Sequence, residues 1–358
     1  MKRILLISVF VLCCTFTRAQ QDILVADRTV DDVARILAGL PVEEDSPVAY
    51  WMEKDDWKEH RVQLDSMWES CAATLAQVKE LADNDFADIN GRITDVLYPF
   101  SGPDIAYAAS FFPGASAYWL FAMEKTGSVP DLDRFSQKAF DRYRYALLWH
   151  LANSYFITKR MESDLNNSSV DGTIPILLGF LARMGYRIAG VGYRTLKSDG
   201  TLAASKRPSD AVEISFFNEE EKALKTVSFV SCNIKDGDIR GGVIKLISRL
   251  SPESTAGYTK SCSYCMHRRH FSRIRNLMLD HCFAIIQDDT GIRYNQYDHK
   301  AWELSYYGGY VRPLACFSEW TYQKELDTLY NNGNHVILPL GFRHGYNQPS
   351  SLIVARKK

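Results

Sequence analysis

Residues 97–113 read LYPFSGPDIAYAASFFP, which is an apolar segment, a Gly-Pro-Asp turn and a run rich in aromatic residues. The apolar part has the composition of a β-strand, and Asp104 stands where it would cap a short helix after the turn. A second apolar segment, residues 116–123, follows and ends at Glu124. This order of strand, turn, helix and strand indicates an α/β fold.

Helical and extended patterns continue to alternate toward the C-terminus. Helices are predicted at residues 131–151, 172–185, 270–279 and 322–332, and extended segments at 154–160, 186–194, 211–217, 225–232, 282–289, 302–317, 335–342 and 350–356. Residues 195–210 are polar and typical of a surface loop. The alternation predicts an α/β domain over residues 92–358, with a mixed sheet flanked by helices.

Two amphipathic helices are predicted ahead of this domain. Residues 29–40 repeat apolar side chains at helical spacing, with Thr29 as a candidate N-cap and Gly39 at the end. Residues 57–82 show the same spacing over a longer stretch. We therefore expect a mostly helical N-terminal segment, residues 20–91, packed on the α/β domain.

The first residues have the three parts of a secretory signal peptide. Lys2 and Arg3 precede an apolar run, and small residues lie just before a cleavage point after Ala19. The run is shorter than the roughly 20 residues that span a bilayer, and no other stretch of that length is predicted to cross one. Residues 1–19 therefore predict export, with the mature protein periplasmic, associated with the cell envelope or secreted.

Composition limits the class of partner. The chain of 358 residues carries 42 Lys and Arg against 43 Asp and Glu, so no basic surplus favours binding to nucleic acid. Hydrophobic residues make up 46% and charged residues 24%, which is typical of a globular protein with a large core. An unidentified partner in the cell envelope is compatible with this composition.

The cysteines are too sparse for a disulfide scaffold. Cleavage of the signal would remove Cys13 and Cys14, which lack the preceding small residues of a lipidation site. Six cysteines remain, namely Cys71, Cys232, Cys262, Cys265, Cys282 and Cys316. An oxidising compartment allows one or two disulfide bonds, but the sequence does not assign the pairs.

The turn after residue 100 is the first candidate ligand site. In open α/β sheets ligands bind beyond the carboxyl ends of strands, where we expect Gly102, Asp104 and Tyr107, with Glu124 at the end of the next strand. This unit resembles the first half of a methyltransferase-like Rossmann domain. The single glycine, and Pro103 without an N–H donor, argue against a nucleotide cofactor. The structural alternative is a tight turn, a helix cap and aromatic residues that fill the core.

A second candidate site is the acidic pair Asp288 and Asp289, which ends the extended segment at residues 282–289. Two carboxylates at a strand end can bind a divalent cation or supply a general base, and they are also common in ordinary turns. If the strands at 93–100 and 282–289 lie side by side and parallel, Asp104 would join them as a third metal ligand.

A third candidate is the sequence CSYCMHRRH at residues 262–270. Cys262, Cys265, His267 and His270 could bind zinc, the two cysteines could be a redox pair, or they could be structural or bridged. The absence of a second C-x-x-C pair weakens the zinc interpretation.

Four segments together carry a resemblance to a family: LYPFSGPDIAYAASFFP, FAMEKTG, SYFITKRMESDL and AIIQDDTGIR. They resemble an uncharacterised family of exported bacterial proteins that share a Y-x-F-x-G-P-D turn and a Q-D-D-[ST]-G-I element, from about Ile93 to the C-terminus. The resemblance implies export and a shared α/β domain, with no known activity or cofactor. Arg293 departs from the expected proline, and Cys262 and Cys265 replace small or apolar residues, so a shared cysteine site is not expected.

Two functional hypotheses follow. In the first, the protein is a non-catalytic ligand-binding or envelope protein whose ligand contacts the turn at Gly102 and the acidic pair. In the second, it is a metal-assisted hydrolase that uses Asp104, Asp288 and Asp289 as ligands or bases for a divalent cation. The substrate, the disulfide pairs and the oligomeric state are not predictable from the sequence.

Overall fold

The computed structural model describes residues 24–153, 155–156, 163, 165–166, 170–317, 319–338 and 351–358. The predicted signal peptide lies outside these residues, as does most of the extended segment predicted at 154–160. The segment predicted at 335–342 lies only partly within them.

The elements follow the predicted alternation of helices and strands. The helices are α1 (Arg28–Leu37), α2 (Asp55–Asn84), α3 (Ala87–Asn90), α4 (Ile105–Phe111), α5 (Gln137–Asn153), α7 (Ile174–Arg183), α8 (Gly241–Ile247), α9 (Ser272–His281) and α10 (Lys324–Asn331). The strands are β1 (Asp95–Pro99), β2 (Ala117–Ala122), β3 (Arg187–Leu196), β4 (Leu202–Ala204), β5 (Ala211–Phe217), β6 (Leu224–Ser231), β7 (Thr255–Thr259), β8 (Ala284–Gln287), β9 (Trp302–Gly308) and β10 (Ser351–Lys357).

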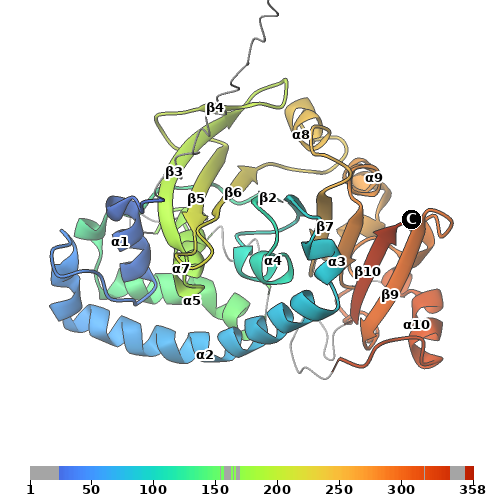
Figure 1. Ribbon diagram of the computed structural model, residues 1–358, viewed down its shortest axis with the longest axis horizontal. Helices are drawn as coiled ribbons and strands as arrows, with labels where there is room; N and C mark the ends of the chain where they lie inside the picture. The colour runs from blue at the N-terminus through green and yellow to red at the C-terminus, as the bar shows by residue number, and fades with distance from the viewer. Residues whose placement is uncertain are drawn as a thin grey trace, which may run out of the picture.

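These strands form one mixed sheet in the order β4-β3-β5-β6-β2-β1-β7-β8-β10-β9 (Figure 1). The five central strands, from β6 to β8, are parallel. Antiparallel strands extend both sides, with β5, β3 and β4 beyond β6, and β10 paired antiparallel with both β8 and β9. The predicted mixed sheet with flanking helices is therefore confirmed.

The order in which the chain adds parallel strands to the sheet reverses at β1. From β1 the chain adds β2 and then β6 on one side, and it returns to place β7 and then β8 on the other side. This is the 3-2-1-4-5 order of doubly wound nucleotide-binding folds, in which the crevice lies at the carboxyl ends of the strands where the order reverses. The loops that follow β1 and β7 meet at that point.

Four of these elements, α3, β4, β7 and α8, are absent from the sequence prediction, and β4 lies within residues 195–210, which were wrongly predicted to be a surface loop throughout. The β7 sequence TAGYT has only five residues, of which Ala256 and Gly257 are small, so it lacks the apolar alternation that marks a strand. Gly257 is needed there because an added Cβ would lie 2.7 Å from Met278 Cε on α9. The position of β7 depends on close packing against residues that lie far along the chain, and the local sequence pattern does not reveal such contacts.

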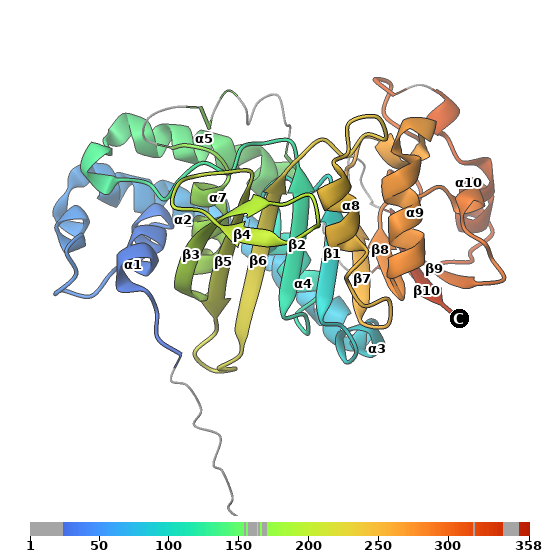
Figure 2. The same cartoon turned by 90° about the horizontal axis from the view of Figure 1, so that it is seen from above.

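Helices cover both faces of the sheet, as Figure 2 shows with α8 and α9 on one side and α2, α5 and α7 on the other. Alternate residues of β1 divide between the two layers: Val96 and Tyr98 belong to the larger core, and Leu97 to the core under α8 and α9. All three are buried. The aromatic run after β1 lies in the larger core, where Phe111 and Phe112 are fully buried.

The N-terminal helical segment packs on the larger-core side. Helix α2 runs beneath the sheet in Figure 1 and packs on α4 and α5, while α1 packs on α7 and β3. Asp27 caps α1 and accepts the Thr29 N–H, so the predicted N-cap Thr29 is wrong by two residues. Asp31 ties α1 to β3, because its carboxylate accepts the Ile188 N–H at 2.7 Å and pairs with Arg187 at 2.8 Å. Within the ranges given above, no helix has the length and apolarity needed to cross a membrane.

Candidate functional site

A pocket of about 340 Å³ opens at the carboxyl edge of the parallel strands, where the strand order reverses. Its lining comes from the loops after β1, β2, β6 and β7 and from two further segments: Phe100, Gly102, Phe121, Ala122, Met123, Glu124, Phe156, Cys232, Asn233, Ile234, Ser261, Cys262, Ser263, Cys265 and Phe271. The volume falls in the usual range for small-molecule sites. We call this cavity the switch pocket.

The two loops that meet at the switch pocket hold strained backbone. Phe100 after β1, and Ser261, Ser263 and Tyr264 after β7, all have φ between 51° and 60°. Residues other than glycine rarely adopt this left-handed region, at a cost of about 1–3 kcal/mol each when bulky or poorly compensated. Such strain is concentrated at functional sites, where the surrounding structure enforces it.

Gly102 lies in the same conformation, with φ of 53°. A Cβ added there would also lie 3.3 Å from the ring of Phe156. The turn therefore needs glycine for its backbone and to let the Phe156 ring form a wall of the pocket.

Asp104 has the predicted capping role and a further set of buried contacts. Its Oδ1 accepts the Tyr107 N–H of α4 at 3.2 Å, and its Oδ2 accepts the Tyr98 hydroxyl at 3.0 Å. Oδ2 also lies 2.6 Å from Lys260 Nζ. Burial raises the pKa of Asp104, but the charge of Lys260, the nearby His150 and the hydrogen bonds from Lys260 and Tyr107 together outweigh burial, and the pKa falls below its ordinary value. Asp104 is thus a buried anion.

Lys260 is the main site residue that sequence reasoning missed. It follows β7, its side chain is 1% exposed, and its ammonium lies 3.5 Å from the centre of the Tyr107 ring. Burial lowers the pKa of Lys260, while Asp104 opposes that shift. The only signal in the sequence is a lysine after the unrecognised strand, so the ion pair was not predictable without β7.

His150 completes the buried cluster from α5. Its Nε2 lies 3.3 Å from Asp104 Oδ1, and its ring stacks on Phe156 with centres 4.4 Å apart. Burial lowers the pKa of His150 to about 3, so the imidazole is neutral at physiological pH. The Asp104 and Lys260 charges therefore balance each other beside a neutral ring.

A smaller chamber of about 30 Å³ lies behind the switch pocket, roughly the volume of one water molecule. Asp104 and Lys260 line it, and it shares Phe100, Gly102, Glu124, Phe156 and Ser261 with the switch pocket. Of the residues predicted for the first site, Gly102 and Glu124 line the pocket and Asp104 lines the chamber. Tyr107 lies beneath Lys260 and belongs to neither lining.

Asp288 and Asp289 follow β8, but the condition for their predicted convergence with Asp104, that strands β1 and β8 lie side by side, is not met. Strands β1 and β8 are parallel, yet β7 lies between them. Asp288 fixes the loop after β7, because its carboxylate accepts the N–H of Ser261 at 2.8 Å. It also accepts the N–H of Thr290 at 3.0 Å. Burial raises the pKa of Asp288 to about 6.

Asp289 has a similar structural role. It accepts the Tyr264 hydroxyl at 2.8 Å and the Ser351 hydroxyl at 3.2 Å. Burial, together with the charge of Asp288, raises the pKa of Asp289 to about 7. The acidic pair holds the strained loop after β7 in place, and neither residue lines the switch pocket.

The predicted metal sites are not formed in the part of the chain that the structure covers. There, no three His, Cys, Asp or Glu side chains are grouped so that they could hold a metal ion. The carboxylates of Asp104, Asp288 and Asp289 instead accept hydrogen bonds from the protein, and Asp104 pairs with Lys260. The zinc interpretation of Cys262, Cys265, His267 and His270 fails on the same finding, and the six cysteines from Cys71 onward are free thiols.

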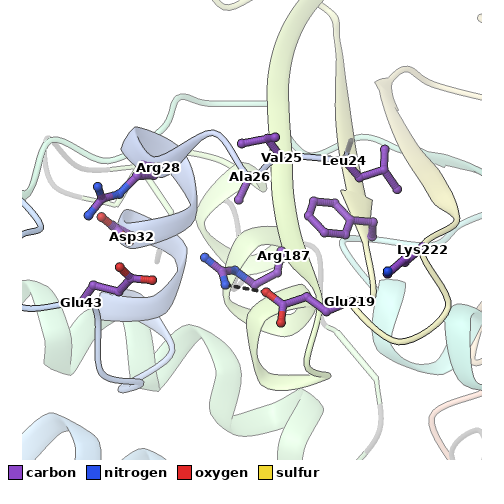
Figure 3. A pocket seen from close by; sticks show the side chains of 10 residues that line it. Leu24, Val25, Ala26, Arg28, Asp32, Glu43, Arg187, Glu219 and Lys222 are labelled. Atoms are coloured by element: carbon purple, nitrogen blue, oxygen red, sulfur yellow. Dashed lines mark hydrogen bonds and ion pairs between the residues drawn. The ribbon is translucent and has the colours of Figure 1, made fainter. Parts of the chain in front are cut away.

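A larger cavity of about 690 Å³ lies at the opposite edge of the parallel strands, between α1 and the turn that joins β5 to β6 (Figure 3). Two of its charged side chains form ion pairs within the protein: Arg187 with Asp31 and Glu219, and Arg28 with Asp45. It borders Leu24, where the described chain begins. The cavity does not lie at the point of strand reversal, although Lys222 of its lining also has a left-handed φ, of 51°.

Comparison of the chain with protein-family models, with curated proteins and with solved structures finds no match.

Proposed function

We propose that this protein binds a small organic ligand in the switch pocket, in a role that is not catalytic. The observation that carries the proposal is the coincidence of a 340 Å³ pocket with the point of strand reversal, bounded by left-handed loops after β1 and β7. Doubly wound sheets bind ligands at this point, and the cost of strained loops needs a functional reason.

The walls favour a ligand with a flat apolar or aromatic body. Four phenylalanines line the pocket, and Phe100 and Phe271 lie edge to face with ring centres 5.4 Å apart. Met123, with 56% of its surface exposed, lies at the mouth. Offset or edge-to-face contact with an aromatic ligand is worth about 0.5–1.5 kcal/mol per ring beyond the area it buries.

The polar groups favour a ligand that is neutral or cationic. The described lining contains Glu124, Asn233 and two serines, and it contains no Lys, Arg or His. Pro103 removes one backbone N–H from the turn, and the nearby Lys260 charge is balanced by Asp104. A phosphate group would lack charged partners here, so phosphorylated ligands are disfavoured.

A thermal-unfolding screen tests this proposal. The panel pairs nucleosides, aryl glycosides and aromatic amines with their phosphorylated or carboxylated counterparts. A ligand at roughly 100 times its dissociation constant adds about 2.7 kcal/mol to the free energy of unfolding, so a neutral or cationic member should raise Tm by several degrees.

Two variants locate the ligand. Phe271→Ala removes one pocket wall and should reduce the ligand-induced shift in Tm, whereas Tyr145→Ala, at a half-exposed position on α5, should leave it unchanged. An undiminished shift in Phe271→Ala, or a preference for the anionic members, would refute the proposal.

Export belongs to the same proposal and rests on residues 1–19. Lys2, Arg3 and the apolar run that follows support it. A binding protein outside the cytoplasm would meet ligands taken up or released by the cell, and an envelope partner would act on the loaded form.

A further inference from the structure

The sequence C-S-Y-C after β7 forms a tight hydrogen-bonded turn at the switch pocket. The Cys265 N–H donates to the Cys262 carbonyl at 2.9 Å, which closes the turn. The two central residues, Ser263 and Tyr264, have φ of 52° and 55°. Positive φ at both central positions is the signature of a type I′ turn.

This turn brings the two cysteines within bonding range. The first and fourth residues of a β-turn have Cα atoms less than about 7 Å apart, and disulfides bridge Cα separations of about 4.4–6.8 Å. Both thiols are free, and both line the switch pocket. We propose that Cys262 and Cys265 are a reversible dithiol–disulfide site that reacts with low-molecular-weight disulfides such as oxidised glutathione.

The two thiols differ in access, which sets the order of reaction. Cys265 is partly exposed, whereas Cys262 is 3% exposed and its thiol donates to the Thr290 carbonyl at 2.8 Å. A small disulfide in solution therefore reacts first with Cys265, without having to bind in the pocket. Cys262 is the resolving thiol, and it must release Thr290 to react.

The exchange proceeds in two balanced steps. Cys265 loses its proton to water, and the thiolate attacks one sulfur of oxidised glutathione, which releases one glutathione thiolate and leaves a mixed disulfide. The Cys262 thiolate then attacks Cys265 Sγ and releases the second glutathione thiolate, so the cysteines lose two electrons and glutathione gains them. The two protons from the cysteines complete the two molecules of reduced glutathione.

The turn keeps its shape without the disulfide bond, because other contacts hold it. Tyr264 donates its hydroxyl to Asp289 at 2.8 Å, and the Cys262 N–H donates to the Thr290 hydroxyl at 2.9 Å. The backbone turn that brings the two residues together is therefore already formed in the dithiol state. Burial raises the pKa of both thiols, so the exchange should be faster at pH 8.5 than at pH 7.

The test uses the full chain in oxidised glutathione at pH 8.5, followed by alkylation, tryptic digestion and mass spectrometry. Cleavage after Lys260 and Arg268 places both cysteines in one peptide, residues 261–268. The expected product is this peptide without alkyl groups and lighter by two hydrogens, and dithiothreitol should restore alkylation of both thiols.

Controls make the result decisive. Cys316 is exposed and should become glutathionylated, which shows that the oxidant is active. Cys262→Ser should trap glutathione on Cys265, and Cys232→Ser, which alters the other thiol of the pocket, should change nothing. The proposal is overturned if residues 261–268 stay fully alkylated while Cys316 is modified, or if Cys265 bonds to Cys232 in the unaltered chain.

Discussion

At the scale of single residues, the most informative feature is the buried ion pair of Asp104 and Lys260 at the point of strand reversal. Both side chains are at most 2% exposed, so their desolvation is costly. Replacing such a pair by neutral groups is often tolerated, whereas removing one partner leaves an uncompensated charge. The presence of this costly ion pair next to the switch pocket fits a ligand site that needs polar groups in fixed positions.

Lys260→Met should lower the free energy of unfolding by about 3–5 kcal/mol, because it leaves the Asp104 charge buried without its positive partner. The double variant Asp104→Asn and Lys260→Met should recover most of that loss. Urea unfolding measures the free energy of unfolding of the single and the double variant.

The matched control for this ion pair is Lys79→Met, which breaks the exposed pair with Asp83 on α2 and should cost less than about 1 kcal/mol. Equal effects of Lys260→Met and Lys79→Met would contradict the assigned role of the buried pair.

The raised pKa of Asp289 predicts that the free energy of unfolding depends on pH. Its folded pKa of about 7 lies above the ordinary value of 3.8, so the folded state holds the proton more tightly than the unfolded chain does. The stability contributed by this group is therefore fully present below about pH 3.8 and is lost as the pH rises through about 7. Asp289→Asn should be more stable than the unaltered protein by about 2–4 kcal/mol at pH 8 and about equal to it at pH 4.5.

Urea unfolding of the Asp289→Asn variant at the two pH values checks this. The amide oxygen of Asn can still accept from Tyr264 and Ser351, so the loop should stay in place. A stability difference that does not change with pH would show that the carboxyl group is not protonated in the folded protein at low pH.

At the scale of elements, the prediction succeeded where local pattern determines structure. The strand and turn at residues 97–104, the cap at Asp104 and the helix at α7 with Pro175 in its first turn follow from residues close in sequence. β7 was missed because small residues and Gly257 suit packing against α9. With β7 missing, β1 was expected beside β8, and Lys260 could not be placed.

Gly257→Val tests how tightly β7 is packed. The new Cβ would meet Met278 Cε at 2.7 Å and Ile285 Cγ1 at 3.1 Å, so we expect a loss of about 1–3 kcal/mol from overpacking. Gly237→Ala is the control, since nothing lies within 4 Å of its added Cβ. If thermal unfolding shows no difference between the two variants, β7 does not pack on α9 as described.

At the scale of the whole molecule, the sheet separates two edges with different characters. The carboxyl edge of the parallel strands has the switch pocket and four non-glycine residues with left-handed φ, whereas the opposite edge has the larger cavity, where Arg28 and Arg187 pair with carboxylates and Lys222 alone of the lining has a left-handed φ. The fold class was predictable, since alternation of elements sets the layers. The strand order was not, because it depends on contacts between β1 and residues that lie far along the chain.

Export is a prediction for the whole chain. Expressed with residues 1–19 in a bacterial host, the protein should be recovered outside the cytoplasm with Gln20 as its first residue, as N-terminal sequencing will show. A variant without residues 2–19 should remain in the cytoplasm. Recovery of the complete chain, starting at Met1, from the cytoplasm alone would contradict export.

The most direct test of the central claim is crystallographic screening of the protein with small neutral and cationic aromatic fragments. The account predicts that bound fragments gather in the switch pocket, against Phe100, Phe156 and Phe271. Fragments found only in the cavity beside Arg187 and Glu219, with the switch pocket empty at every concentration, would contradict it.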